Sequence, residues 1–261
     1  YVLLENSSSA AQAFEKLIRE FPLSSLARKA GIQLGLLYYN DNQPEKALAA
    51  YKQVISNYPG SEEAKIALQD LKSVYIDLND INAYASYVNS IGGNIRLEVG
   101  EQDSLTYNAA EKLFMRGDND GARRSLINYL QTFPEGAFSS NANFYLGSIA
   151  FAKKEFDEAI QRFKSVIASG DTKFLEESVA RTAEIEYLSK DYPAALESFK
   201  RLQIVAENPE NRQAARLGIM RCALQTGQQK DALLAADELL KEPKLSPELE
   251  AEARYVRAKA Y

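Results

Sequence analysis

A recurring phrase along the chain is the strongest constraint on its fold. An aromatic residue followed by proline and a short turn-like stretch occurs at Phe21-Pro22-Leu23-Ser24, Tyr58-Pro59-Gly60-Ser61 and Phe133-Pro134-Glu135-Gly136. Pro22 and Pro59 are 37 residues apart, and Pro134 follows Pro59 by 75 residues, which is about two such periods. A period of about 20–50 residues is typical of solenoids, whose repeats bury their apolar faces against one another.

A helical pattern precedes each of these prolines. Ala10, Ala47 and Ala122 stand twelve residues before the three prolines, and apolar residues follow each alanine at offsets of four and seven. These offsets define one face of a helix. The pattern continues without the proline at Ala159, Ala195 and Ala232. We therefore predict helices that cross their neighbours closely at the alanines, and burial of Ala47, Ala159 and Ala195.

Another helix is predicted upstream of each of these. Its marker is Leu34-Gly35 with Tyr38, and we align Leu146-Gly147 and Leu217-Gly218 with it as weaker copies. Glycine inside a helix costs about 1 kcal/mol relative to alanine. Its recurrence therefore indicates a close helix crossing at this position.

The sequence thus predicts an all-α chain of about fourteen antiparallel helices in about six repeats. The expected helices are 8–20, 25–39, 44–57, 61–77, 80–91, 103–116, 119–132, 138–152, 155–169, 173–189, 192–206, 209–225, 228–241 and 247–260. Alternating apolar and charged residues interrupt the period at 94–102 and favour an extended segment. We expect an N-terminal group of repeats at 1–93, a hinge at 94–102 and a C-terminal group at 103–261. Limited proteolysis should then cleave first near Arg96.

These residues resemble the tetratricopeptide repeat family. In the copy from Arg28 to Ser61, the small and aromatic positions of the family are occupied by Leu34, Gly35, Tyr38, Ala47, Tyr51 and Pro59. Gly31 departs from the pattern, because the family has a large aromatic residue there. The resemblance covers nearly the whole chain, and it implies a right-handed α-α superhelix.

The phrase Tyr/Phe-Pro-x-Ser-x-x-Ala is similar to one branch of that family in particular. This branch comprises bacterial envelope proteins such as the Tol-Pal-associated periplasmic protein and the lipoprotein of the outer-membrane protein assembly machine. The resemblance implies a periplasmic or outer-membrane-associated location, and a cytoplasmic location stays open as an alternative.

Composition argues against several classes of function. The net charge is −5 and the pI about 5.1, whereas nucleic-acid binders carry basic faces, so no nucleic-acid partner is expected. The longest apolar runs are only a few residues, so no transmembrane segment is expected. The chain has no histidine, which removes the commonest general base and metal ligand. We expect no catalytic residue, no metal and no cofactor.

Two local motifs have simple structural interpretations. Asp118-Asn119-Asp120-Gly121 matches the start of a calcium-binding loop, but Tyr129 stands where such a loop requires glutamate. An inter-helix turn capped by an aspartate is expected instead. Cys222 is the single cysteine, and a free cysteine is usually a small buried hydrophobe.

The candidate binding residues are aromatic and aliphatic side chains outside the repeat core. Phe144 and Phe151 lie two helical turns apart and so face the same way. We align Arg181 with Phe144 on the next repeat, and aromatic residues beside arginine are typical of interface hot spots. Ile32, Leu36 and Tyr39 occupy positions where the family lines its concave face. No Lys/Asn clamp for a peptide carboxylate is present on these helices.

The leading hypothesis is a non-catalytic scaffold that binds a partner peptide or helix on its concave face, in assembly or maintenance of the bacterial envelope. The alternatives are a self-associating structural array, in which copies of the chain form a homo-oligomer, and a glycan- or nutrient-binding module. Neither end of the sequence has the polar cap of a complete solenoid, so we expect a fragment of a longer array.

Overall fold

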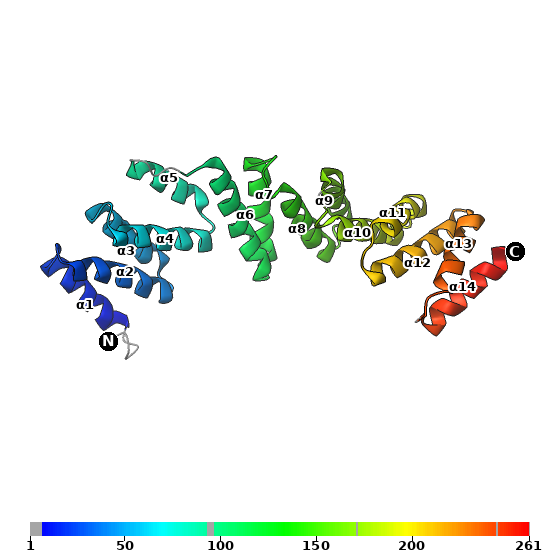
Figure 1. Ribbon diagram of the computed structural model, residues 1–261, viewed down its shortest axis with the longest axis horizontal. Helices are drawn as coiled ribbons and strands as arrows, with labels where there is room; N and C mark the ends of the chain where they lie inside the picture. The colour runs from blue at the N-terminus through cyan, green and yellow to red at the C-terminus, as the bar shows by residue number, and fades with distance from the viewer. Residues whose placement is uncertain (1–6, 93–96, 171, 244, 261) are drawn as a thin grey trace. The chain divides into compact units, whose positions relative to one another are not determined.

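The computed structural model describes residues 7–92, 97–170, 172–243 and 245–260 (Figure 1). Across these residues the chain forms fourteen helices and no strand, and 81% of the residues are helical. The prediction of an all-α fold built from about fourteen helices is therefore confirmed. No helix in this part of the chain combines the length and hydrophobicity that a membrane span requires.

The helices fall into two compact units, which divide between Ala110 and Glu111. The first unit holds α1 (Ser7–Glu20), α2 (Ser25–Asn40), α3 (Pro44–Asn57), α4 (Glu62–Asp77), α5 (Ile81–Ile91) and the first part of α6 (Val99–Met115). The second unit holds the end of α6, α7 (Asn119–Thr132), α8 (Ser139–Ala152), α9 (Phe156–Ser169), α10 (Leu175–Leu188), α11 (Tyr192–Val205), α12 (Pro209–Gln225), α13 (Gln229–Leu239) and α14 (Pro247–Ala260).

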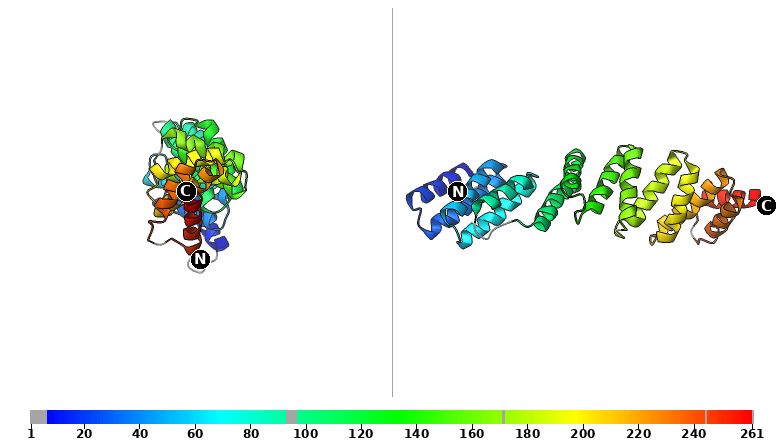
Figure 2. Two further views of the ribbon diagram at one scale, coloured as in Figure 1. Left: turned by 90° about the vertical axis from the view of Figure 1, so that its right-hand side faces the viewer. Right: turned by 90° about the horizontal axis from the view of Figure 1, so that it is seen from above.

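Within each unit, helices that follow one another in sequence pack side by side. In the first unit α1 to α5 contact their chain neighbours, and α2 also contacts α4. In the second unit the same succession runs from α7 to α14, with additional contacts of α10 with α12 and of α12 with α14 (Figure 2). The even-numbered helices are thus the first helices of the repeats, and the odd-numbered helices are the second.

The alanines of the second helices lie where the pattern predicts. Ala47, Ala159 and Ala195 are each 0% exposed, and so are Ala122 and Ala232. A methyl group is all that fits where two helices approach this closely. The predicted burial is confirmed.

The serine of the recurring phrase begins a helix in two repeats. Ser24 caps α2 by accepting a hydrogen bond from Ala27 N at 3.0 Å, and Ser61 caps α4 in the same way, from Ala64 N at 3.1 Å. Such caps stabilise a helix by about 1 kcal/mol. Asp118 caps α7 through a 2.9 Å hydrogen bond from Gly121 N, as the sequence predicts.

One predicted alignment is wrong. A Cβ atom at Gly35 would lie 2.4 Å from the ring of Tyr51, and one at Gly147 would lie 2.8 Å from Phe163, each on the following helix. A Cβ at Gly218 would instead lie 2.4 Å from Phe199, on the preceding helix α11. Met220, twelve residues before Ala232, occupies the position that corresponds to Gly35 and Gly147.

The predicted start of α6 also needs correction. The helix begins at Val99, four residues before the predicted 103, so Val99 to Gln102 are not part of an extended segment. Leu97 and Glu98 are non-helical, and the residues 93–96, with Arg96 among them, lie outside the described ranges. The hinge at 94–102 and the cleavage near Arg96 stay predictions.

Candidate functional site

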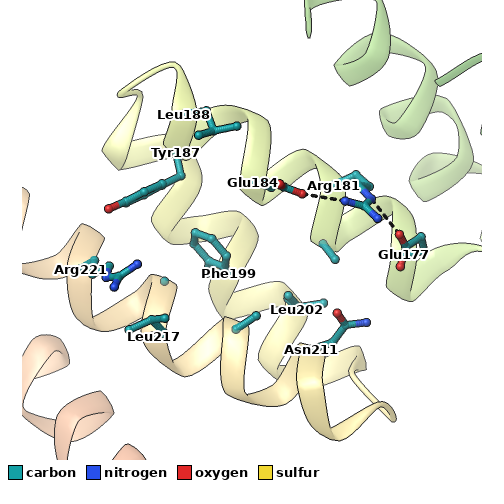
Figure 3. Close-up of a pocket in the computed structure, with 13 residues that line it drawn as sticks. Glu177, Arg181, Glu184, Tyr187, Leu188, Phe199, Leu202, Asn211, Leu217 and Arg221 are labelled. Carbon is teal, nitrogen blue, oxygen red and sulfur yellow. Dashed lines mark hydrogen bonds and ion pairs between the residues drawn. The ribbon is translucent and has the colours of Figure 1, made fainter. Parts of the chain in front are cut away.

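An open groove with a mainly apolar lining lies between α10 and α12 of the second unit (Figure 3). Its volume is about 280 Å³. Apolar residues form its base and walls: Ala180, Leu188, Phe199, Leu202, Ala214, Leu217 and Gly218. Polar groups surround them: Glu177, Arg181, Glu184, Tyr187, Asn211 and Arg221. We call this set of residues the α10–α12 groove.

The repeat pattern changes at the groove. Phe199 corresponds to Tyr51 and Phe163, which pack on glycines of their own repeats. In this repeat the glycine is replaced by Ala183, which is 0% exposed. The ring of Phe199 packs instead against Gly218 of the next first helix and forms part of the base of the groove.

Arg181 is held at the edge of the groove by residues of its own unit. Its Nε donates to Glu177 at 2.8 Å and its Nη1 to Glu184 at 2.9 Å. The guanidinium carbon also lies 4.9 Å from the ring centroid of Phe151 on α8, in a cation–π contact. Figure 3 shows Arg181 between its two carboxylate partners along α10.

Arg221 is held equally firmly on the other side of the groove. Its Nε and Nη2 each donate to Glu252 of α14 at 2.7 Å, a bidentate pair with good geometry. The pKa of the guanidinium is raised, chiefly by these hydrogen bonds with Glu252, and Tyr187 contributes another. Both arginines of the groove therefore have their charges neutralised within the protein.

The structure brings together three of the predicted binding residues. Phe144 and Phe151 lie on α8 and are half-buried, packed against the cluster of Ala150, Ala159, Phe163 and Ile185. Arg181 joins them through Phe151. The predicted equivalence of Arg181 with Phe144 is off by one residue, because Ala180 stands 36 positions after Phe144, as Ala183 does after Gly147.

Phe144 has an aromatic partner that the sequence analysis did not foresee. Its ring is stacked on Phe174 with the centroids 4.2 Å apart and the planes at 14°. Phe163 and Tyr145 also lie within about 6 Å of it, at 6.1 and 5.8 Å. One face of Phe144 is therefore covered before any ligand binds.

The other three predicted binding residues lie on α2 in the first unit. Ile32 and Tyr39 are half-buried against the core of that unit, and the Tyr39 hydroxyl donates to the carboxylate of Asp77. Leu36 is 41% exposed. Binding by these three residues stays a prediction.

Most residues of the α10–α12 groove were not predicted, although the sequence contains a signal for them. Counting eight residues back from the alanine of each second helix aligns Tyr187 with Phe151 and Tyr39. Counting fifteen residues back aligns Leu217 with Phe144 and Ile32. Aligning the repeats on their Leu-Gly pairs gives a different register for α12, because Gly218 is not equivalent to Gly35 and Gly147.

Truncation of the two phenylalanines of α8 should separate packing from binding. We expect Phe144→Ala to lower the free energy of unfolding by about 1–2 kcal/mol, less than a fully buried ring, because part of the ring is exposed. Phe151→Ala should cost no more than that, through loss of its packing against the same cluster and of the cation–π contact with Arg181. Urea denaturation followed by circular dichroism measures both, and a larger loss for Phe151→Ala would contradict the packing described above.

Among the described residues, no group of three His, Cys, Asp or Glu side chains is found that could hold a metal ion. Cys222 is 0% exposed, and burial raises the pKa of its thiol to about 11, which opposes formation of a reactive thiolate.

Comparison with known proteins supports the repeat assignment. Two tetratricopeptide repeat family models match residues 30–61 and 107–172. The C-terminal part of a TPR repeat-containing protein from Cytophaga hutchinsonii is similar in structure, with 13% identity, 94% of each chain covered and a TM-score of 0.50. No match was found among curated proteins.

Two further solved structures align over most of the chain at lower similarity. PilW, described as a widely conserved type IV pilus biogenesis factor, is 15% identical over 88% of this chain and 99% of its own, with a TM-score of 0.44. YrrB, described as a TPR protein with an unusual peptide-binding site, is 18% identical over 79% of this chain and 98% of its own, with a TM-score of 0.39.

The paired helices, the buried alanines and the family matches define an α-helical repeat protein. More specifically, residues 30–61 and 107–172 match models of the tetratricopeptide repeat. Proteins of this kind are protein-interaction scaffolds, and the fold is generally non-catalytic.

Proposed function

We propose that the chain is a non-catalytic scaffold that binds a peptide or helix of a partner protein in the α10–α12 groove. One observation carries the proposal: an apolar, open cavity lies between two consecutive first helices, with Leu217 and Phe199 in its lining. First helices form the binding surface of helical-repeat proteins. Buried apolar anchors in such grooves supply most of the affinity for a peptide.

The envelope part of the proposal rests on the sequence. The Tyr/Phe-Pro-x-Ser-x-x-Ala phrase is typical of envelope members of the family, and two of its serines are helix caps here. We propose that the partner belongs to the machinery that assembles or maintains the bacterial envelope, and that the chain acts in the periplasm or at the outer membrane.

The arrangement of the aromatic rings favours a protein partner over a glycan. A sugar stacks on an open ring face, but one face of Phe144 is occupied by Phe174 and Phe151 is covered by Arg181. A second copy of the chain as partner is tested by the experiment below.

Site-specific photo-cross-linking tests the proposal. A photoreactive phenylalanine analogue at Leu188, which lines the groove and is 55% exposed, should cross-link to a discrete partner in an envelope extract of the source organism. The same analogue at Leu234 of α13, which is 54% exposed outside the groove, is the matched control.

The cross-link from position 188 should disappear when Leu217→Arg places a charge in the groove. A product that survives Leu217→Arg, or that forms equally from position 234, would contradict binding in the groove. A product of twice the mass of the chain would favour self-association instead.

A further inference from the structure

The size of the groove fits one side chain of a partner better than a free small molecule. Its volume of about 280 Å³ lies at or below the range of about 300–1,000 Å³ typical of small-molecule pockets. The apolar lining, with Phe199, Leu202 and Leu217 at its centre, suits a leucine-sized or aromatic group (Figure 3). Selectivity must then come from the polar groups around it.

The two arginines of the groove are poorly suited to recognise an acidic partner. Arg181 already donates to Glu177 and Glu184, and Arg221 already forms a bidentate pair with Glu252. A partner carboxylate would have to displace these internal partners. It would also meet the carboxylates that hold Arg181.

The carboxylates of the groove retain free oxygen acceptors. Glu177 and Glu184 each use one carboxylate oxygen for Arg181, and their side chains are 42% and 45% exposed. Asn211 donates through Nδ2 to Glu176 at 2.7 Å, which leaves its amide oxygen as an acceptor beside the groove. These oxygens favour a partner that supplies donors.

The charges around the groove also favour a cationic partner. Three carboxylates, Glu177, Glu184 and Glu252, face two guanidiniums across and beside the groove. The whole chain carries a net charge of −5, which favours encounter with cationic segments and disfavours acidic ones. Pairing of two copies of the chain through this site would have to overcome the same repulsion.

We infer that the α10–α12 groove takes a basic peptide segment, in which a large apolar side chain enters the groove and a neighbouring lysine or arginine pairs with the carboxylates of Glu177 and Glu184. The inference rests on the proposed function and specifies the partner for that same site. The apolar anchor supplies affinity, and the basic residue supplies selectivity and faster association.

Selection from a phage-displayed library of random peptides against the whole chain tests this inference. Peptides that also bind the Leu217→Arg variant are removed, so that the remaining ones depend on the groove. We expect these peptides to contain a large apolar residue with lysine or arginine close beside it, and their affinity should fall as salt is added.

Reversing the charge of Glu184 tests its ion pair with the basic residue of the peptide. Glu184→Lys should weaken binding of a selected peptide by about tenfold, equivalent to about 1.4 kcal/mol. Replacing the basic residue of the peptide by glutamate should restore binding to this variant. Glu197→Lys is the matched control, because Glu197 lies on α11 outside the groove with its side chain 77% exposed, and it should leave the affinity nearly unchanged.

The outcomes separate this inference from the proposed function. Groove-dependent peptides with acidic or uncharged neighbours beside the anchor would overturn the inference alone, as would equal effects of Glu184→Lys and Glu197→Lys. A failure to select any groove-dependent peptide would overturn the proposed function and the inference with it.

Discussion

Phe163→Ala is expected to lower the free energy of unfolding by about 3–5 kcal/mol, the cost typical of removing a fully buried ring. Phe163 is 0% exposed and packs on Gly147 of α8, where a Cβ atom would lie 2.8 Å from its ring. The cavity left by alanine cannot be filled by Ala150 or Ala159, whose side chains are single methyl groups. Urea denaturation monitored by far-ultraviolet circular dichroism measures the loss.

Phe21→Ala serves as the control for this prediction. Phe21 is 59% exposed, so its truncation should cost less than about 1 kcal/mol. If Phe163→Ala were no more destabilising than Phe21→Ala, the assignment of Phe163 to the core of the second unit would be wrong.

The large effect has a structural reason beyond the volume of one ring. The cluster around Phe163 joins Ala150 of α8, Ala159 of α9 and Ile185 of α10, so it connects one repeat to the next. In a solenoid each repeat contacts only its neighbours, and stability is approximately a sum of repeat and interface contributions. Loss of this ring therefore weakens an interface that no distant contact replaces.

Much of the fold can be predicted from the sequence, because each repeat packs its two helices with residues at the same spacing. The alanines of the second helices recur at a fixed spacing from aromatic residues, and Ala47, Ala159 and Ala195 are fully buried for that reason. Gly31, which departs from the family pattern, is explained by Val54, since a Cβ atom at Gly31 would lie 2.4 Å from it.

The candidate site was harder to predict, because it arises where the repeat varies. Position 183 holds alanine where other repeats have Gly35 and Gly147, and Phe199 packs against Gly218 of the next first helix, which is a contact between two repeats. The internal ion pairs of Arg181 and Arg221 likewise depend on side chains from other turns and helices. Spacing alone marks which residues share a face, but it does not show which charges are already paired.

The same substitution at two glycines should therefore have different effects. A Cβ atom would lie 2.4 Å from the nearest ring atom both at Gly35, facing Tyr51, and at Gly218, facing Phe199. Tyr51 is 1% exposed in a filled core, so we expect Gly35→Ala to cost about 2 kcal/mol. Overpacking costs about 1–3 kcal/mol, and the higher helix propensity of alanine offsets about 1 kcal/mol of it at most.

Gly218→Ala should also cost about 1–3 kcal/mol, because a Cβ there would meet Cγ and both Cδ atoms of Phe199, and the ring would have to move towards the groove that it borders. The displaced ring would then occupy the space of the partner's apolar side chain. We expect this variant to remain folded in thermal denaturation while its affinity for groove-dependent peptides falls by about tenfold or more. Full retention of peptide binding by Gly218→Ala would contradict the role assigned to Phe199, since the groove would then not be the space into which its ring moves.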